Sequence, residues 1–165
     1  MMKTEELKLV TEWDKTFQKS DKVDHSKVTF VNHFGITLAA DMYVPKDASG
    51  KLPAIAVSGP FGACKEQSSG LYAQTMAERG FLTIAFDPSF TGESGGFPRA
   101  MHSPDIDVED FQAAVVRNPL SAIVCAYNPD ACSLHAPNGP DTAIAGNFPS
   151  PFFGTYISAA SVLPK

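Results

Sequence analysis

Hydrophobic and polar residues alternate in two stretches of the first third of the chain. Residues 27–32 (K-V-T-F-V-N) alternate polar with apolar side chains, and residues 36–44 (I-T-L-A-A-D-M-Y-V) form a second apolar-rich run. The short connection between them contains Gly35. Two such runs, joined by a short turn that contains glycine, predict an antiparallel β-hairpin.

The next two hydrophobic runs are continuous. Residues 52–59 (L-P-A-I-A-V-S-G) and 81–86 (F-L-T-I-A-F) have the pattern that is typical of strands buried on both faces. Residues 71–79 lie between them and predict a helix that ends near Gly80, since glycine readily adopts the left-handed conformation of a helix C-terminus. This order predicts a βαβ unit with two parallel strands.

Two more helices are predicted at the borders of this region. Residues 108–116 follow Asp105 and Asp107, which are candidate caps for the amino-terminal end of a helix. In residues 1–26, apolar side chains recur every three or four positions, and this spacing predicts a solvated amphipathic helix. These apolar residues are Leu7, Val10, Trp13 and Phe17.

The chain changes character after residue 116. Residues 117–165 contain seven of the 13 prolines but only four charged residues, although the chain has 13 basic and 18 acidic side chains. Within this segment only residues 122–127 (A-I-V-C-A-Y) predict a buried strand. So long a stretch with so little regular signal is unusual in a folded domain. We therefore divide the chain into an amino-terminal helical segment (1–26), an α/β region (27–116) and an irregular tail (117–165) that is not native to the fold.

Composition narrows the classes of function. The net charge of -5 and the isoelectric point near 5.2 disfavour a nucleic-acid partner, whose phosphates are usually met by a basic surface. No apolar stretch resembles a signal peptide or a membrane span, so we predict a cytoplasmic protein without membrane association. Cys64, Cys125 and Cys132 lack a C-x-x-C spacing, and no dinucleotide-binding or P-loop motif occurs. We expect no metal site and no cofactor.

Two loops at the predicted carboxyl ends of the parallel strands carry candidate chemistry, because ligand sites of α/β sheets form there. Residues 58–65 (S-G-P-F-G-A-C-K) contain two glycines and suit backbone N–H groups that stabilise an oxyanion; a turn without a ligand is the alternative. Residues 92–96 (G-E-S-G-G) match G-x-S-x-G, which presents a catalytic serine on a sharp turn directly after a strand. Ser94 stands seven residues beyond Asp87, which disfavours a role as nucleophile.

The order of these features resembles the amino-terminal part of the α/β-hydrolase fold. The similarity extends over residues 27–116 and includes F-G-I-T-L-A-A-D-M-Y-V-P, the G-P-F-G-A loop and F-D-P-S-F-T-G-E-S-G-G. The first segment fits the G-x-x-L-x-x-x-x-Y-x-P signature of the dienelactone-hydrolase-like and acyl-peptidase-like bacterial branch. The resemblance implies an antiparallel hairpin followed by a parallel βαβ unit, and hydrolysis of a small ester, lactone or peptide.

The resemblance also implies roles for individual residues. The family's D-x-R-G-x-G-x-S-x-G loop, whose serine usually holds the loop together, coincides with Asp87, Gly92, Ser94, Gly95 and Gly96. In the family the nucleophile follows a later helix and strand. Ser94 is therefore predicted to be structural.

The loop at residues 58–62 resembles the family's H-G-x-x-G oxyanion loop, with Ser58 at the histidine position. Pro60 has no N–H to donate. Phe61 or Gly62 is therefore predicted to supply the amide that binds the oxyanion.

The remaining parts of such a catalytic site are missing from the sequence. An acyl-transfer hydrolase needs a nucleophile, a base and an orienting carboxylate. After residue 116 there is no G-x-S-x-G or G-x-C-x-G, and the one late histidine, His135, is either the base or an ordinary loop residue. We interpret the chain as the front of a hydrolase whose continuation was lost or replaced, for example by a frameshift. We expect little or no esterase activity, and self-association through an exposed sheet edge.

Two alternatives stay open. A small serine hydrolase would use Ser94 with His102 or His135 and with Asp87 or Asp105. A non-catalytic α/β module would bind a small anion at a helix end.

Overall fold

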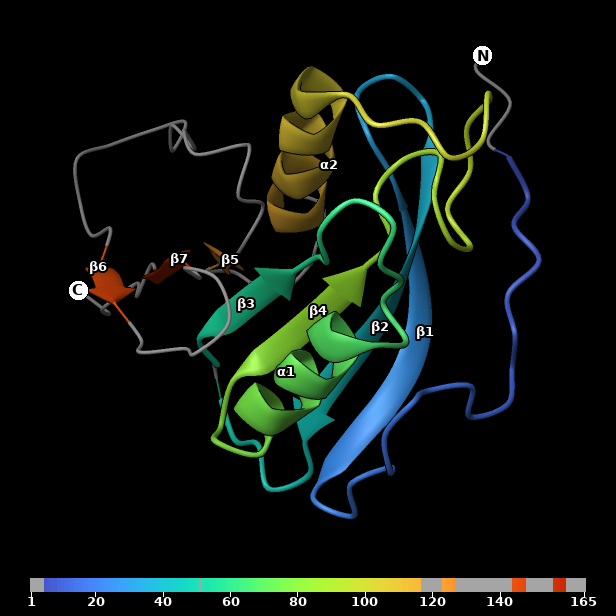
Figure 1. Cartoon of the computed structure of the whole chain (residues 1–165). Helices are drawn as coiled ribbons and strands as arrows, with labels where there is room; N and C mark the ends of the chain where they lie inside the picture. Colours follow the sequence, from blue (N-terminus) through green and yellow to red (C-terminus); the bar gives the residue numbers. More distant parts are fainter. Residues whose placement is uncertain (1–4, 51, 117–122, 127–143, 148–155, 160–165) are drawn as a thin grey trace.

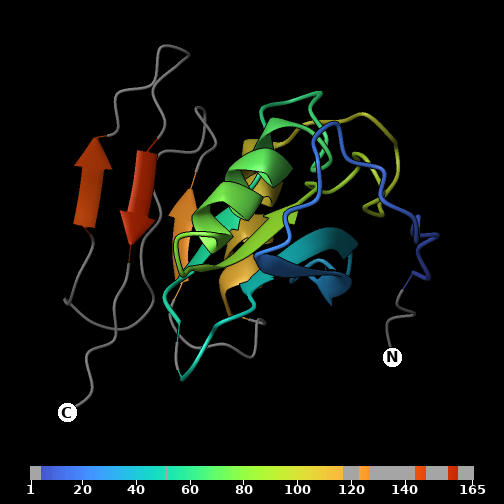
Figure 2. The same cartoon turned by 90° about the horizontal axis from the view of Figure 1, so that it is seen from below.

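A mixed β-sheet with two helices forms the part of the chain that the computed structural model describes, namely residues 5–50, 52–116, 123–126, 144–147 and 156–159 (Figure 1). Its elements are β1 (Val23–Val31), β2 (Thr37–Pro45), β3 (Ala54–Val57), α1 (Ser68–Ala77), β4 (Leu82–Phe86), α2 (Pro104–Val116), β5 (Ile123–Ala126), β6 (Ile144–Asn147) and β7 (Tyr156–Ala159). The strands lie in the order β1-β2-β4-β3-β5-β7-β6. Figure 2 shows β6 and β7 at one end of this sheet and β1 at the other.

The predicted hairpin is confirmed. Strand β1 pairs antiparallel with β2 from Val23 opposite Pro45 to Val31 opposite Thr37, so it begins four residues earlier than the alternation indicated. The connecting turn is closed by Asn32, whose side-chain oxygen accepts a hydrogen bond from the Ile36 N–H at 2.9 Å.

The predicted βαβ unit is confirmed as well. Strands β3 and β4 run parallel, and α1 lies between them in sequence and in front of them in Figure 1. Helix α1 begins three residues before the predicted start. Gly80 follows it with φ of 95°, the left-handed conformation that the sequence analysis expected.

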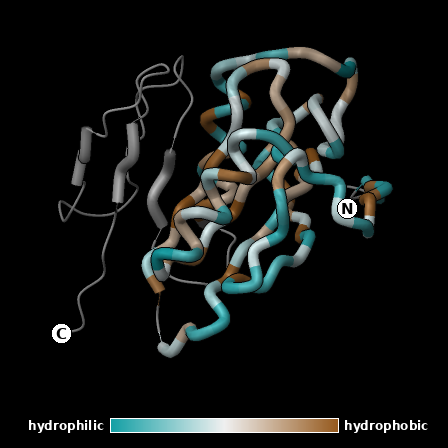
Figure 3. Tube along the Cα trace, turned by 60° about the horizontal axis from the view of Figure 1, so that its bottom comes forward, coloured by the Kyte–Doolittle hydropathy of each residue, from teal (hydrophilic) through white to brown (hydrophobic). Residues whose placement is uncertain are grey.

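The two helices cover opposite faces of the sheet. Side chains on one face, including Ile55 and Val57, pack against α1, while Ile84 and Phe86 on the other face pack against Phe111 of α2. Neighbouring strand residues thus contribute to different cores, because successive side chains of a strand point to opposite faces. Figure 3 shows hydrophobic stretches along these inner elements and hydrophilic ones at the periphery.

Helix α2 begins four residues before its predicted start. Asp105 and Asp107 therefore lie in its first turn instead of capping it, and the Asp107 N–H donates to the carbonyl of Ser103 at 2.9 Å. Acidic side chains in a first turn still favour the positive end of the helix dipole.

The predicted amphipathic helix near the amino terminus is wrong for the described residues 5–22, which are not helical. This segment runs alongside the hairpin (Figure 1), and Trp13 and Phe17 pack against the core on the α1 side. Lys15 is buried, with its Nζ 3.0 Å from Oδ2 of Asp41. These tertiary contacts override a helical spacing of apolar residues.

The tail contains more sheet than the sequence predicted. Strand β5 confirms the expected strand at residues 122–127 and pairs parallel with β3. Two short strands that the sequence did not predict, β6 and β7, pair antiparallel with each other. They escape sequence analysis because four-residue strands such as I-A-G-N carry little periodic signal. That the tail is otherwise irregular and not native to the fold stays a prediction. In the described part of the chain, no helix is long and apolar enough to cross a membrane. Self-association through a sheet edge stays a prediction.

Candidate active site

The turn after β3 presents backbone amides at the carboxyl end of the sheet. The Ala63 N–H donates to the Pro60 carbonyl at 2.9 Å, and Gly62 has φ of 86°. Neither the N–H of Phe61 nor that of Gly62 donates to another described residue, and the Phe61 side chain is 62% exposed. Both candidate amides are therefore available to a ligand.

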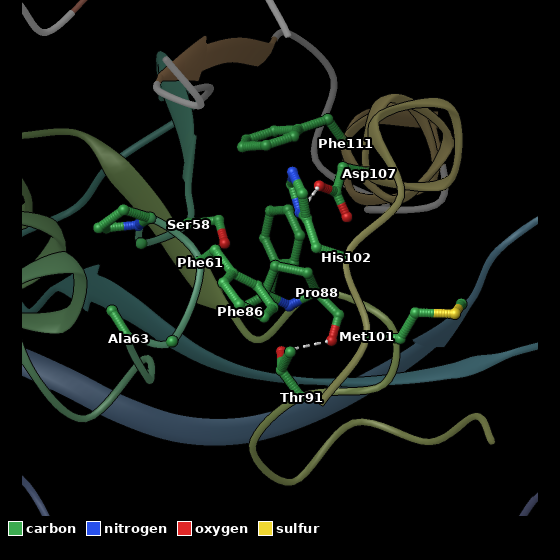
Figure 4. A pocket seen from close by; sticks show the side chains of 13 residues that line it. Ser58, Phe61, Ala63, Phe86, Pro88, Thr91, Met101, His102, Asp107 and Phe111 are labelled. Atoms are coloured by element: carbon green, nitrogen blue, oxygen red, sulfur yellow. Dashed lines mark hydrogen bonds and ion pairs between the residues drawn. The ribbon is translucent and has the colours of Figure 1, made fainter. Parts of the chain in front are cut away.

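A small hollow of about 20 Å³ lies beside this turn (Figure 4). The rings of Phe86 and Phe111 form part of its apolar wall, with centroids 4.9 Å apart. Ser58 also lines it and is only 2% exposed, yet its Oγ has no hydrogen-bond partner among the described residues. The hollow thus combines aromatic walls with an unpaired hydroxyl.

A histidine and a carboxylate form a pair on another side of the hollow. The Nδ1 atom of His102 lies 2.8 Å from Oδ2 of Asp107, and the His102 ring packs 5.3 Å from that of Phe61 (Figure 4). A carboxylate at Nδ1 keeps the proton on that nitrogen and leaves Nε2 for other partners. Burial raises the pKa of Asp107, while the neighbouring His102 acts in the opposite direction. Sequence analysis missed this pair, since it treated Asp107 only as a helix cap.

The carboxylate of Asp87 joins the loop after β3 to the loop after β4. It is fully buried, and its Oδ1 accepts a hydrogen bond from the Lys65 N–H at 2.8 Å. Its Oδ2 accepts from Lys65 Nζ at 2.8 Å and from the Glu93 N–H at 3.0 Å. Gly92 has φ of 50°, and a Cβ atom there would lie 2.2 Å from Oδ2. The loop can therefore close over Asp87 only with glycine at this position.

Ser94 lies inside the junction of β2 and β4. The ladder between these strands ends at Ala40 opposite Phe86, and Ala39 and Asp87 lie one position beyond it. There the Asp87 N–H donates to the Ala39 carbonyl at 3.1 Å. The reciprocal bond is replaced by the Ser94 hydroxyl, which accepts from the Ala39 N–H at 2.8 Å and donates to the Asp87 carbonyl at 2.6 Å. Ser94 is 1% exposed and has no described histidine as a partner.

The remaining members of the G-E-S-G-G loop are held by backbone contacts. The Gly95 N–H donates to the Thr37 carbonyl and the Phe90 N–H to the Gly95 carbonyl, both at 2.8 Å. Gly96 has φ of 96°. The guanidinium of Arg99 donates to the carbonyls of Gly92 and Ser94. Asp87, Gly92, Ser94 and Gly95 are thus brought together in one loop.

A buried ionic cluster surrounds this loop. Lys65 also contacts Glu66 and lies 2.7 Å from Glu93, which in turn pairs with Lys27 at 2.6 Å. Burial alone would lower the pKa of Lys65, but Asp87 and the two glutamates raise it overall. Burial would raise the pKa of Glu93, but hydrogen bonds from Lys27 and Lys65 lower it. Both lysines are therefore firmly cationic in this cluster.

Two sets of three side chains in this cluster have ligand atoms close enough together to bind a cation. One consists of Asp14, Glu66 and Glu93, and the other includes Glu66 and Asp87 with the Cys64 thiol. Lysine ammonium groups already lie among these carboxylates, and burial raises the pKa of the Cys64 thiol. Ion pairing accounts for both groups.

Asp105, a candidate carboxylate of the small serine hydrolase, is exposed on α2. Two histidines that the sequence analysis did not propose lie elsewhere: His25 pairs with Asp41 at 2.8 Å, and His33 is exposed in the hairpin turn. His135 and Cys132 lie outside the described residues, as does the segment after β5 where the family places its nucleophile.

Comparisons with known proteins agree with this architecture. Residues 35–116 match the X-Pro dipeptidyl-peptidase (S15) family. The uncharacterised protein PA2218 of Pseudomonas aeruginosa is 70% identical over 111 residues, which are 67% of this chain and 30% of that protein. Its crystal structure superposes with a TM-score of 0.68, at 66% identity, over 70% of this chain and 37% of that one.

Two further relatives are named as hydrolases. The thiohydrolase aneE of Aspergillus aculeatus is 31% identical over 96 residues, 58% of this chain and 29% of that protein. The α/β hydrolase GrgF of a Penicillium species superposes with a TM-score of 0.52, at 28% identity, over 61% of this chain and 34% of that one. The matched segment belongs to the α/β-hydrolase superfamily.

This α/β-hydrolase segment is the amino-terminal part of the domain. The chain spans about a third of the length of the relatives reported above. The family match ends at residue 116, where the composition changes. The superfamily predicted from the sequence is thus confirmed, while the dienelactone-hydrolase-like branch stays a prediction.

Proposed function

We propose that the chain carries the oxyanion-binding side of an α/β-hydrolase site and, as it stands, hydrolyses esters little or not at all. The observation that carries this proposal is the double hydrogen bond of the Ser94 hydroxyl to the ends of β2 and β4. A nucleophilic serine needs a base within hydrogen-bond reach. The Ser94 hydroxyl instead donates to one backbone carbonyl and accepts from one backbone N–H, so we assign it a structural role.

The amides of Phe61 and Gly62 are the groups we assign to the oxyanion. When a nucleophile attacks an ester, lactone, thioester or peptide, negative charge develops on the carbonyl oxygen. Preorganised N–H donors stabilise this charge by about 3–4 kcal/mol each in other enzymes. Both amides lack partners in the described residues and lie at the carboxyl end of β3, where sites of α/β sheets form.

Activity assays on the purified chain test this proposal. We expect no hydrolysis of p-nitrophenyl acetate above that of the Ser94→Ala variant, and no labelling of Ser94 by a fluorophosphonate. Turnover that disappears in Ser94→Ala, together with label on Ser94, would establish the small serine hydrolase instead.

The anion-binding alternative finds less support. Lys65, which lies just after the glycine-containing turn, already pairs with Asp87, Glu66 and Glu93. An anion at this loop would meet these carboxylates. A thermal shift of the chain with inorganic phosphate, without any turnover, would favour that alternative.

A further inference from the structure

We call residues 60–63 the oxyanion turn, and the part of the adjoining hollow lined by Ser58 and His102 its polar corner. The proposed function gives no role to this corner. Ser58 is 2% exposed, and its Oγ is one of the few buried side-chain oxygens without a partner in the described part of the chain. A buried hydroxyl that makes no hydrogen bond destabilises a fold. An occupant of the hollow that pairs with Ser58 is therefore favoured.

His102 supplies a second polar atom. Its Nδ1 is engaged by Asp107 at 2.8 Å, and no hydrogen bond joins its Nε2 to any other described residue. A neutral imidazole protonated at Nδ1 is an acceptor at Nε2. The corner therefore offers the Ser58 hydroxyl, which can donate, and an imidazole nitrogen, which can accept.

Size and surroundings restrict what can bind here. A volume of about 20 Å³ holds one water-sized group. A carboxylate would approach the Asp107 side chain, and an ammonium group has no lone pair to accept the Ser58 O–H. A neutral hydroxyl group, which both donates and accepts, fits these constraints.

A second, larger hollow is lined by residues of the same turn. It has a volume of about 280 Å³ and shares Phe61, Gly62 and Ala63 with the first. Phe90 contributes to its largely apolar lining. A molecule whose body lies in this hollow and whose hydroxyl reaches the polar corner would pass the amides of Phe61 and Gly62.

We propose that Ser58 and His102 form a subsite for a hydroxyl group on the acyl part of the substrate, close to the carbonyl that Phe61 and Gly62 bind. This assignment rests on the proposed function of the turn. It makes Ser58 and His102 specificity-determining residues for hydroxyacyl esters, and Asp107 a positioning residue that holds the imidazole.

Two pairs of isosteric esters test the subsite by NMR titration of the full chain. Methyl lactate is compared with methyl isobutyrate, and methyl 3-hydroxybutyrate with methyl 3-methylbutyrate, so that each pair differs by a hydroxyl against a methyl group. We expect the hydroxy ester of at least one pair to bind about tenfold more tightly, as two hydrogen bonds allow, and to shift the His102 ring signals.

Variants separate the subsite from the turn. Ser58→Ala and His102→Asn should each abolish the hydroxyl preference, whereas His33→Asn, at an exposed histidine, should retain it. Equal binding within both pairs, no binding of any ester, or a preference that survives Ser58→Ala would overturn the subsite. Shifts of the Phe61 and Gly62 amides without a hydroxyl preference would leave the proposed function standing. A preference without these amide shifts would support the subsite and count against the oxyanion assignment.

Discussion

Replacing Ser94 with alanine should weaken the junction between β2 and β4. The substitution removes the hydroxyl that accepts from the Ala39 N–H at 2.8 Å and donates to the Asp87 carbonyl at 2.6 Å. Each hydrogen bond contributes about 1 kcal/mol, and a buried group left unpaired costs about 1–3 kcal/mol. Both backbone groups belong to fully buried residues. We therefore expect the free energy of unfolding to fall by about 2–4 kcal/mol.

Urea unfolding monitored by tryptophan fluorescence measures this loss. Trp13 is the one tryptophan of the chain, and it packs against the core on the α1 side. With a slope of about 2 kcal/mol per molar urea, the midpoint should fall by about 1–2 M. Ser26→Ala, at an exposed position of β1, should change stability by less than about 0.5 kcal/mol. A Ser94→Ala variant as stable as Ser26→Ala would refute the assignment of this hydroxyl to the strand junction.

Three further predictions concern the surroundings of this loop. Gly92→Ala should lower the free energy of unfolding by more than about 3 kcal/mol, because its Cβ would lie 2.2 Å from a carboxylate oxygen of Asp87. Gly80→Ala is the control in the same urea titration: it has open space around it and should cost only about 1–2 kcal/mol of backbone strain. Lys65→Met should cost about 3–5 kcal/mol, since it leaves the buried Asp87 carboxylate without its cation; a loss below 1 kcal/mol in calorimetry would contradict this. Burial raises the pKa of Asp110 from 3.8 to about 6, although the hydrogen bonds that its carboxylate accepts lower it. The folded state therefore retains the proton up to a higher pH than the unfolded state does. The free energy of unfolding should decrease as the pH rises from 4 to 6. The decrease, up to about 3 kcal/mol relative to Asp110→Asn, is read from urea midpoints at each pH, and parallel profiles of the two proteins would exclude it.

Local patterns of hydrophobic residues and glycines predicted the central strands and helices of the fold. Runs such as residues 52–59 and 81–86 are long and apolar enough to identify buried strands, and Gly80 marks the end of a helix. The predicted start of α1 is three residues late because the helix opens with S-S-G, which are weak helix formers. The predicted start of α2 is four residues late because Asp105 and Asp107 were interpreted as caps, whereas they lie within the first turn.

Ion pairs between residues far apart in the chain could not be predicted from the sequence. The charges of Lys15, Lys27 and Lys65 suggest solvated side chains, but each is held by carboxylates from distant segments. The contact of Lys15 with Asp41 holds the amino-terminal segment against the sheet in a non-helical form, although its apolar spacing fits a helix. The polar corner of Ser58 and His102 was missed for the same reason, since 44 positions separate residue 58 from residue 102.

The buried carboxylate of Asp87 explains how a loop that matches a nucleophile motif can matter to the site without touching a substrate. Asp87 accepts two hydrogen bonds from Lys65, which lies only two residues after Ala63, the last residue of the turn that follows β3. Glu93, within the G-E-S-G-G loop, binds the same carboxylate through its N–H. A change in this loop that displaces Asp87 therefore also displaces the amides of the turn. Because Ser94 lies seven positions after Asp87, the loop returns its hydroxyl to the ends of β2 and β4, where it holds the strands together. The turn whose amides we propose to bind the oxyanion is held in place by the Asp87 carboxylate.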